Sequence, residues 1–289
     1  MKKHILTIAL TVCSTLAMQA QQPLACCGNA QEKVPLAQPG DGLFAHPWQG
    51  RRVAYLGDSI TDPDVKAGKE KWWTFLEQWL QLTSLVYGVN GQQWCHIPEQ
   101  ANRLYNDHGQ DLDAILIFMG TNDFNDGIPL GRWFDEQEER VFAATGKPQK
   151  EVERKRRMPN KNPGTLCGRI NIAMEQLKKC YPEKQIVLLT PIHRGYAFFG
   201  NNNVQPPENY QNSCGLYFDS YVKAIREAGE IWAVPVIDLA QLSGLLPTLT
   251  EHHQYFANPD TDQLHPNDKG YQRLARTLYY QLLTLPTQF

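Results

Sequence analysis

An uninterrupted apolar run, Ala114–Met119, constrains the fold more than any other feature of this 289-residue chain. A strand with one face in water alternates apolar and polar residues, whereas a strand covered on both faces can be apolar throughout. Four other short apolar runs have the same character: Val53–Leu56, Leu85–Tyr87, Ile186–Leu189 and Val234–Ile237. The five runs predict a parallel sheet with helices packed on both of its faces.

The stretches between these runs show helical periodicity. In the first, Trp72, Leu76 and Leu80 fall on one side of a helix. The predicted helices span residues 72–82, 97–106, 166–180, 215–228 and 269–285. Strands that alternate with helices build parallel sheets through right-handed crossovers. We therefore expect a flavodoxin-like α/β/α sandwich with a five-stranded parallel sheet over residues 51–289, with its active site at the carboxyl ends of the strands.

The N-terminus has the pattern of an export signal followed by a leader. Two lysines precede a short apolar run, Ile5–Leu16, which is too short to cross a bilayer. We predict a signal peptide over residues 1–20, a leader or linker over residues 21–50, and export to the periplasm or the extracellular space. Lipid attachment at Cys26, which would anchor the protein at the outer membrane, is the alternative to cleavage near Ala20. No later segment is apolar enough to be transmembrane.

Charge and ligand spacing argue against nucleic-acid and metal binding. The formal net charge is −2, which provides no electrostatic attraction for nucleic acid. His252 and His253 are adjacent but lack an evident third ligand, so no metal is expected. Cys167 and Cys180 fall about 20 Å apart on one predicted helix, whereas a disulfide needs Cα atoms within about 7 Å. The sequence leaves all other pairings open among the six cysteines that follow the signal: Cys26, Cys27, Cys95, Cys167, Cys180 and Cys214.

Two long insertions interrupt the alternation of strands and helices. Residues 124–164 follow the third predicted strand, and residues 194–213 follow the fourth. Insertions of this length are commonly lids or other functional segments. Because both leave carboxyl ends of strands, we expect both to overhang the site. The basic run Arg154–Arg157 in the first insertion is interpreted as the solvated face of a helix.

Four fragments with chemically useful side chains follow different predicted strands. They are Gly57–Thr61, Gly88–Gly91, Gly120–Asp123 and Asp262–Pro266. The first offers a serine hydroxyl, the second a glycine that can bring a backbone N–H close to a ligand, and the third an amide that can donate to an oxyanion. The fourth places an aspartate where it can fix the tautomer of a histidine. Each alone is also an ordinary turn, but the set supplies a nucleophile, an oxyanion hole and an Asp–His pair.

Together the four fragments resemble the blocks that define the SGNH hydrolase superfamily, also called GDSL esterases and lipases. The resemblance extends from residue 57 to residue 266. It implies that Ser59 is the nucleophile and that Asp262 and His265 complete a catalytic triad. It also implies that the Ser59 N–H, Gly91 and Asn122 form the oxyanion hole. The chain contains no G-x-S-x-G elbow, which argues against an α/β-hydrolase.

The resemblance implies a serine esterase that works through an acyl-enzyme and needs no cofactor, and the N-terminal signal implies that it is secreted. Tryptophans near the first two fragments suit sugar rings, so we expect an O-acetyl esterase acting on carbohydrate. The predicted substrate contacts are Asp58, Trp94 and His193. The expected partner is a small-molecule or glycan ester, and the oligomeric state is left open. Two alternatives remain: a lipase or thioesterase acting on longer acyl chains, and a non-catalytic glycan-binding protein that keeps the fold.

Overall fold

The computed structural model describes residues 46–145, 148–287 and 289 of the chain. Its centre is a five-stranded parallel sheet with strand order β2-β1-β3-β6-β9. This order places the first strand between the second and third, as in flavodoxin-like domains. The predicted fold class is therefore confirmed. The strands are β1 (Arg52–Gly57), β2 (Thr83–Val86), β3 (Ala114–Phe118), β6 (Gln185–Leu189) and β9 (Val236–Ile237).

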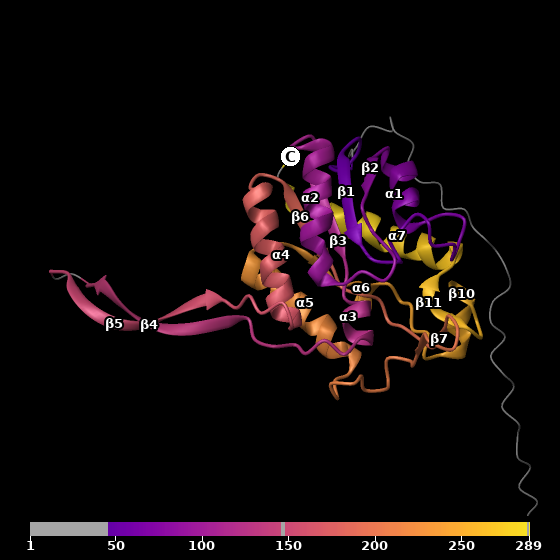
Figure 1. The fold of residues 1–289 in the computed structure, drawn as a ribbon. Helices are drawn as coiled ribbons and strands as arrows, with labels where there is room; N and C mark the ends of the chain where they lie inside the picture. Colours follow the sequence, from indigo (N-terminus) through magenta and orange to yellow (C-terminus); the bar gives the residue numbers. More distant parts are fainter. Residues whose placement is uncertain (1–45, 146–147, 288) are drawn as a thin grey trace, which may run out of the picture. The chain divides into compact units, whose positions relative to one another are not determined.

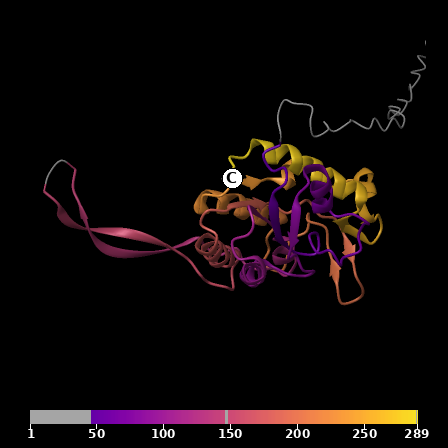
Figure 2. The ribbon, with the colours of Figure 1, turned by 90° about the horizontal axis from the view of Figure 1, so that it is seen from above.

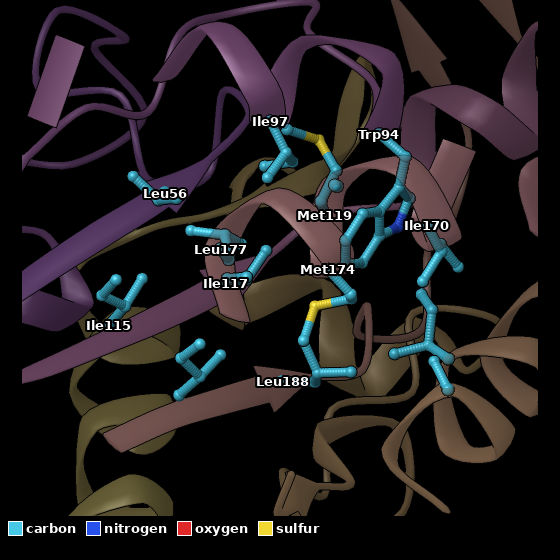
Figure 3. Packing of buried hydrophobic residues seen from close by; sticks show 14 of the residues in the cluster. Leu56, Trp94, Ile97, Ile115, Ile117, Met119, Ile170, Met174, Leu177 and Leu188 are labelled. Carbon is cyan, nitrogen blue, oxygen red and sulfur yellow. The ribbon is translucent and has the colours of Figure 1, made fainter. Parts of the chain in front are cut away.

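Helices cover both faces of this sheet, and the central strand shows how the two cores are divided (Figure 1). Ile115 and Ile117 of β3 face the core formed with α2 (Ile97–His108), α4 (Leu166–Cys180) and α5 (Phe218–Trp232). Figure 3 shows part of that core, in which Met174 and Leu177 of α4 pack near the sheet.

The alternate residues of β3, Ala114, Leu116 and Phe118, face the second core, which is formed with α1 (Trp72–Leu80) and α7 (Asp268–Thr284). The continuous apolar run is thus explained by burial on two sides.

Helix ends follow local capping chemistry. The Thr165 hydroxyl accepts a hydrogen bond from the Gly168 N–H, and α4 begins at Leu166 as predicted. The Asn267 side chain accepts bonds from the N–H groups of two following residues and starts α7. Helix α1 ends at Leu80, earlier than predicted, because Gln81 adopts a left-handed conformation with φ of 54°. The short helices α3 (Thr121–Asn125) and α6 (Leu239–Leu242) follow β3 and β9.

The first insertion forms a β-hairpin and not a cover over the site. Strands β4 (Phe134–Ala143) and β5 (Lys150–Pro159) pair antiparallel with each other, and the hairpin projects away from the sheet in both views (Figures 1 and 2). We call β4 and β5 the arm. The expectation that this insertion overhangs the site is wrong for the arm, and Arg154–Arg157 lies on a strand and not on a helix. The arm's charged side chains offer no apolar face that could pack on the domain.

The second insertion, residues 194–213, contains β7 (Ala197–Phe198) and β8 (Val204–Gln205). These short strands join β10 (Phe256–Asn258) and β11 (Asp262–Pro266) in a second sheet with order β10-β11-β7-β8. Ala197 pairs with Asp262, which ties the insertion to the strand that carries the Asp–His pair. We call residues 194–213 the wall.

Residues 1–45, which include the predicted signal peptide and most of the predicted leader, lie outside the described residues. The end of that leader packs on the domain, because Trp48 is fully buried with its ring 5.2 Å from that of Phe289. Within the described part of the chain, no helix has the length and apolar character needed to cross a membrane. The four cysteines described there, Cys95, Cys167, Cys180 and Cys214, form no disulfide with one another.

Candidate active site

Ser59 lies in the turn that follows β1 and is almost completely buried, with 3% of its surface exposed. The end of β1 is fixed by Gln100 of α2, whose side-chain amide accepts from the Gly57 N–H at 2.9 Å and donates to the Gly57 carbonyl at 2.8 Å. A side chain at Gly57 would meet the Phe118 carbonyl oxygen at 2.7 Å, so only glycine fits there. The serine is therefore placed by a rigid support.

His265 and Asp262 lie on β11 and reach Ser59 through a continuous chain of hydrogen bonds. The Ser59 Oγ and His265 Nε2 are 2.9 Å apart, and His265 Nδ1 is 2.9 Å from Asp262 Oδ2. Asp262 Oδ1 also accepts from the backbone N–H groups of Leu264 and His265. With Nδ1–H donated to the carboxylate, the Nε2 lone pair faces the Ser59 hydroxyl. This arrangement can remove the hydroxyl proton as the oxygen attacks.

Three hydrogen-bond donors surround the space next to Ser59. Gly91 adopts a left-handed conformation with φ of 76°, and a side chain there would meet open space. Across the described ranges, the N–H groups of Ser59 and Gly91 donate to no protein acceptor. Asn122 Nδ2 donates to the Gln92 carbonyl at 2.9 Å, which fixes the amide and leaves its second hydrogen free. The three groups can bind an oxyanion.

A buried ion pair beneath Asn122 holds this donor in place, and sequence analysis missed it. Asp123 is fully buried, accepts from the Trp94 N–H at 3.0 Å and pairs with Arg169 of α4 at 2.9 Å. Burial raises the pKa of Asp123 to about 6, and these two donors oppose the rise. Gln93 bridges the ion pair and the donor, since it accepts from Arg169 and donates to the Asn122 carbonyl. In the sequence, the position of Asp123 directly after the predicted oxyanion donor Asn122 could have indicated this supporting role.

Asp58, Trp94 and His193, the predicted substrate contacts, do not line the pocket at Ser59. Asp58 is buried and accepts from the Ile60 N–H at 3.1 Å, and burial raises the pKa of its carboxyl to about 7. Trp94 is fully buried in the core shown in Figure 3, so it cannot touch a substrate from there. The N–H of Trp94 instead supports Asp123.

His193 lines a different cavity of about 610 Å³. Its Nδ1 lies 2.7 Å from Glu208 Oε1, and this hydrogen bond raises the pKa of His193, while burial opposes the rise. The expectation that His193 contacts the substrate at Ser59 is therefore corrected. His193 lies in the loop after β6, beyond the strand end at Leu189, and the sequence does not specify to which side of this loop its side chain points.

The pocket at Ser59 has a volume of about 690 Å³. Phe199 of the wall places its ring 5.4 Å from the His265 ring. Much of the remaining lining consists of side-chain amides: Asn90, Asn122, Asn125, Asn202, Asn203 and Gln205. The expectation that the wall insertion overhangs the site is thus confirmed, because Phe199, Asn202, Asn203 and Gln205 all belong to it.

Arg194 fastens the wall to the oxyanion side of the pocket. It is completely buried, and its Nη1 donates to the Thr121 carbonyl and hydroxyl at 3.2 Å each. Its Nη2 donates to Gln205, which lines the pocket. Burial lowers the pKa of Arg194 to about 10, opposed by the charges of Glu208 and Asp58. No pattern in the sequence indicates that this arginine is buried.

Among the residues that the structure describes, no group of three or more His, Cys, Asp or Glu side chains could hold a metal ion. His252 Nδ1 accepts from the Leu246 N–H, and His253 Nε2 lies 3.0 Å from the Pro247 carbonyl. The two adjacent histidines therefore bind neighbouring backbone groups.

Comparisons with known proteins place this site in a family. Residues 55–273 match the model of the GDSL-like Lipase/Acylhydrolase family. A protein from Lactobacillus plantarum shares the fold, with a TM-score of 0.62, 22% identity, and 81% of this chain and 97% of that one covered.

A protein described as a possible lipase from Chitinophaga pinensis has a TM-score of 0.59 and 20% identity, with 80% and 97% of the two chains covered. A search of curated sequences found no match. The family match covers most of the chain, including both ends of the hydrogen-bonded Ser59–His265–Asp262 chain. This protein therefore belongs to the GDSL-like lipase/acylhydrolase family, whose chemistry is ester hydrolysis.

Proposed function

We propose that this protein is a serine esterase in which Ser59 attacks the ester carbonyl and His265 acts as general base. The observation that carries the proposal is the continuous hydrogen-bond chain from Ser59 Oγ through His265 to Asp262. The Asp262 carboxylate stabilises the imidazolium that forms when His265 takes the proton. His265 then protonates the departing alcohol, and water attacks the acyl-enzyme by the same route.

The oxyanion of each tetrahedral intermediate would bind the N–H groups of Ser59 and Gly91 and the Asn122 amide. These donors need no reorganisation, because Asn122 is already held by Gln92 and by the buried pair beneath it. Fixed donors aimed at developing charge stabilise the transition state more than the substrate.

For the substrate we favour an O-acetyl ester of a carbohydrate. The tryptophans near Ser59 do not support this substrate, because Trp72 and Trp94 are fully buried. Trp73 is half-buried and does not line the pocket, and its indole N–H donates to the Thr61 carbonyl. The amide lining of the pocket supports this substrate instead. Amides can both donate to and accept from sugar hydroxyls, whereas a long acyl chain lying against them would cost free energy by leaving them without partners. The export signal over residues 1–20, which remains a prediction, agrees with a substrate outside the cytoplasm.

The test is hydrolysis of p-nitrophenyl acetate, butyrate and octanoate and of acetylated xylo-oligosaccharides. We expect the acetyl esters to give the highest kcat/KM and Ser59→Ala to abolish turnover. Ser220→Ala, on α5 and not in the lining of the pocket, is the matched control and should retain wild-type rates. A rate that rises with acyl length would favour a lipase or thioesterase. Glycan binding without turnover by the wild type would favour a non-catalytic binding protein.

A further inference from the structure

The arm is a two-stranded sheet whose strands, among the residues that the structure describes, pair only with each other. Every side chain on β4 and β5 is at least partly exposed, and Phe142, near the end of β4, is 71% exposed. Isolated two-stranded hairpins are marginally stable in water, and three or more strands are usually needed. Each outer edge also carries unpaired N–H and C=O groups that can pair with another strand. The arm is therefore an incomplete sheet.

We propose that the arm pairs with the arm of a second copy of this chain, through antiparallel contact between the two β5 strands. The product is a four-stranded sheet with β4 strands outside. In an antiparallel pair of identical strands, opposite residues differ by an even number of positions, because N–H groups alternate in direction along a strand. With Arg154 on the two-fold axis, Glu153 lies opposite Lys155 of the second copy and Glu151 lies opposite Arg157 of the second copy.

This register extends a charge pattern that the arm already contains. Within one arm, Lys155 is opposite Glu138 and Arg157 is opposite Glu136. Each of these two basic residues would therefore lie between two acidic ones, one from β4 and one from the second copy. Opposite charges directly across a sheet are stabilising. The one like-charged pair is Arg154 with Arg154 of the second copy, and each of these is opposite a Glu139 of its own arm.

Moving the two-fold axis by one residue in either direction gives fewer opposite-charged pairs and more like-charged pairs. With Glu153 on the axis, that residue lies opposite itself and Lys150 lies opposite Arg156 of the second copy. With Lys155 on the axis, that residue lies opposite itself and Arg154 lies opposite Arg156 of the second copy. Each of these arrangements has three like-charged pairs and two opposite-charged pairs, whereas the proposed register has one and four.

Two other ways of pairing the arms are less favourable: β4 with β4 of the second copy, and β5 with β4 of the second copy. Strand β4 carries Asp135, Glu136, Glu138 and Glu139 against a single basic residue, so self-pairing would set acids against acids. Antiparallel pairing of β5 with β4 of the next copy would point both arms the same way. Because each arm contributes two strands, it would then hold two whole domains only about 10 Å apart, where they collide. Pairing through β5 points the arms in opposite directions and keeps the domains apart.

The test uses two charge variants of the full chain. Glu151→Lys with Glu153→Lys leaves only basic charges on β5, and Lys155→Glu with Arg157→Glu makes its acidic residues outnumber its basic ones. By sedimentation equilibrium the wild type should be a dimer, and each variant alone should dissociate about 10²-fold more readily because four attractive pairs become repulsive. A one-to-one mixture should form a heterodimer, since the lysines introduced in one variant would then face the glutamates introduced in the other.

If the mixture dimerises, the variants have lost pairing between arms and not folding. Hydrolysis of p-nitrophenyl acetate by each variant provides a second check that the catalytic domain is folded. A wild type that stays monomeric at about 100 µM, where a dimer with a Kd of about 1 µM would be nearly complete, would overturn the proposal. So would dimers that persist in both variants, which would place the interface elsewhere. Failure of the mixture to dimerise would overturn the register.

Discussion

The wall and the insertion that carries the arm both follow carboxyl ends of strands in the central sheet, yet the wall lines the catalytic pocket and the arm does not. The wall is held by buried anchors, Arg194, Ala197 and Gln205. Its backbone also bonds to β11, as in the Gly195 N–H to Gln263 carbonyl contact at 2.9 Å. The arm has exposed ion pairs such as Arg156–Glu139. The difference shows that an insertion's point of departure does not decide where it packs; its buried side chains do.

The largest expected effect concerns the strand to which the wall is tied. Asp262→Asn should keep the shape of the site but favour the wrong His265 tautomer, lowering kcat by up to about 10⁴-fold. The same change in the arm, Asp135→Asn, removes an ion pair with Arg132 and alters the hydrogen bonds that Asp135 accepts from Asn160, both far from the catalytic pocket, and should leave kcat unchanged. Steady-state kinetics on an acetyl ester compare the two. Near-full activity of Asp262→Asn would mean that another group orients His265.

The next effect concerns the oxyanion donor on α3. Asn122→Ala should lower kcat by about 10²–10³-fold with little change in KM, because the amide is aimed at charge present only in the transition state. Asn160→Ala, at the base of the arm, is the matched control and should stay within about twofold of wild type. If Asn122→Ala instead raised KM and left kcat intact, Asn122 would be a substrate-binding residue.

Replacing one arginine in the wall and one in the arm compares how much each region contributes to stability. Arg194→Met leaves the Thr121 carbonyl and Gln205 without their buried donor, and should lower the free energy of unfolding by about 2 kcal/mol. Arg156→Met removes an exposed pair and should change it by less than about 1 kcal/mol. Urea denaturation of both variants measures the difference. Equal stability of Arg194→Met and wild type would show that the wall is held by its backbone bonds alone.

A pH-dependent effect on stability distinguishes the buried site from the exposed arm. Burial raises the pKa of Asp58 to about 7 in the folded protein, above the unfolded value of about 4. The folded state therefore holds this proton more tightly, and Asp58 stabilises the fold at low pH and loses that contribution as pH rises through 7. In Asp58→Asn, the free energy of unfolding should therefore decline less between pH 4 and 7 than in the wild type. Glu136→Gln in the arm should not change this decline. An unchanged slope in Asp58→Asn would contradict the raised pKa.

The sequence predicted the features that depend on short-range pattern. Buried strands are apolar throughout, so Ala114–Met119 identified the centre of the sheet. Ser59 follows β1 at the carboxyl edge of the parallel sheet, as predicted, whereas Asp262 and His265 lie on β11 of the second sheet, which the sequence did not indicate. The structure places both Ser59 and Asp262 within hydrogen-bond distance of His265.

Features that depend on tertiary burial could not be predicted. Tryptophan is a residue type that stacks on sugar rings, but Trp94 lies in the core. Arginine is usually exposed, but Arg194 is fully buried. The arm was missed for a related reason. Its strands consist largely of consecutive charged residues. They therefore lack the alternation of apolar and polar residues that identifies a strand packed on a core. The acidic run in β4 and the basic run in β5 were the available signal.

The most direct test of the serine esterase assignment is covalent labelling with a fluorophosphonate, followed by peptide mass spectrometry. The reagent forms a stable adduct with an activated serine and resembles the tetrahedral intermediate. The account predicts a single adduct on the peptide that contains Ser59, abolished in Ser59→Ala and slowed in Asp262→Asn. An adduct on another residue, or ester hydrolysis by an enzyme that is never labelled, would contradict Ser59 as the nucleophile.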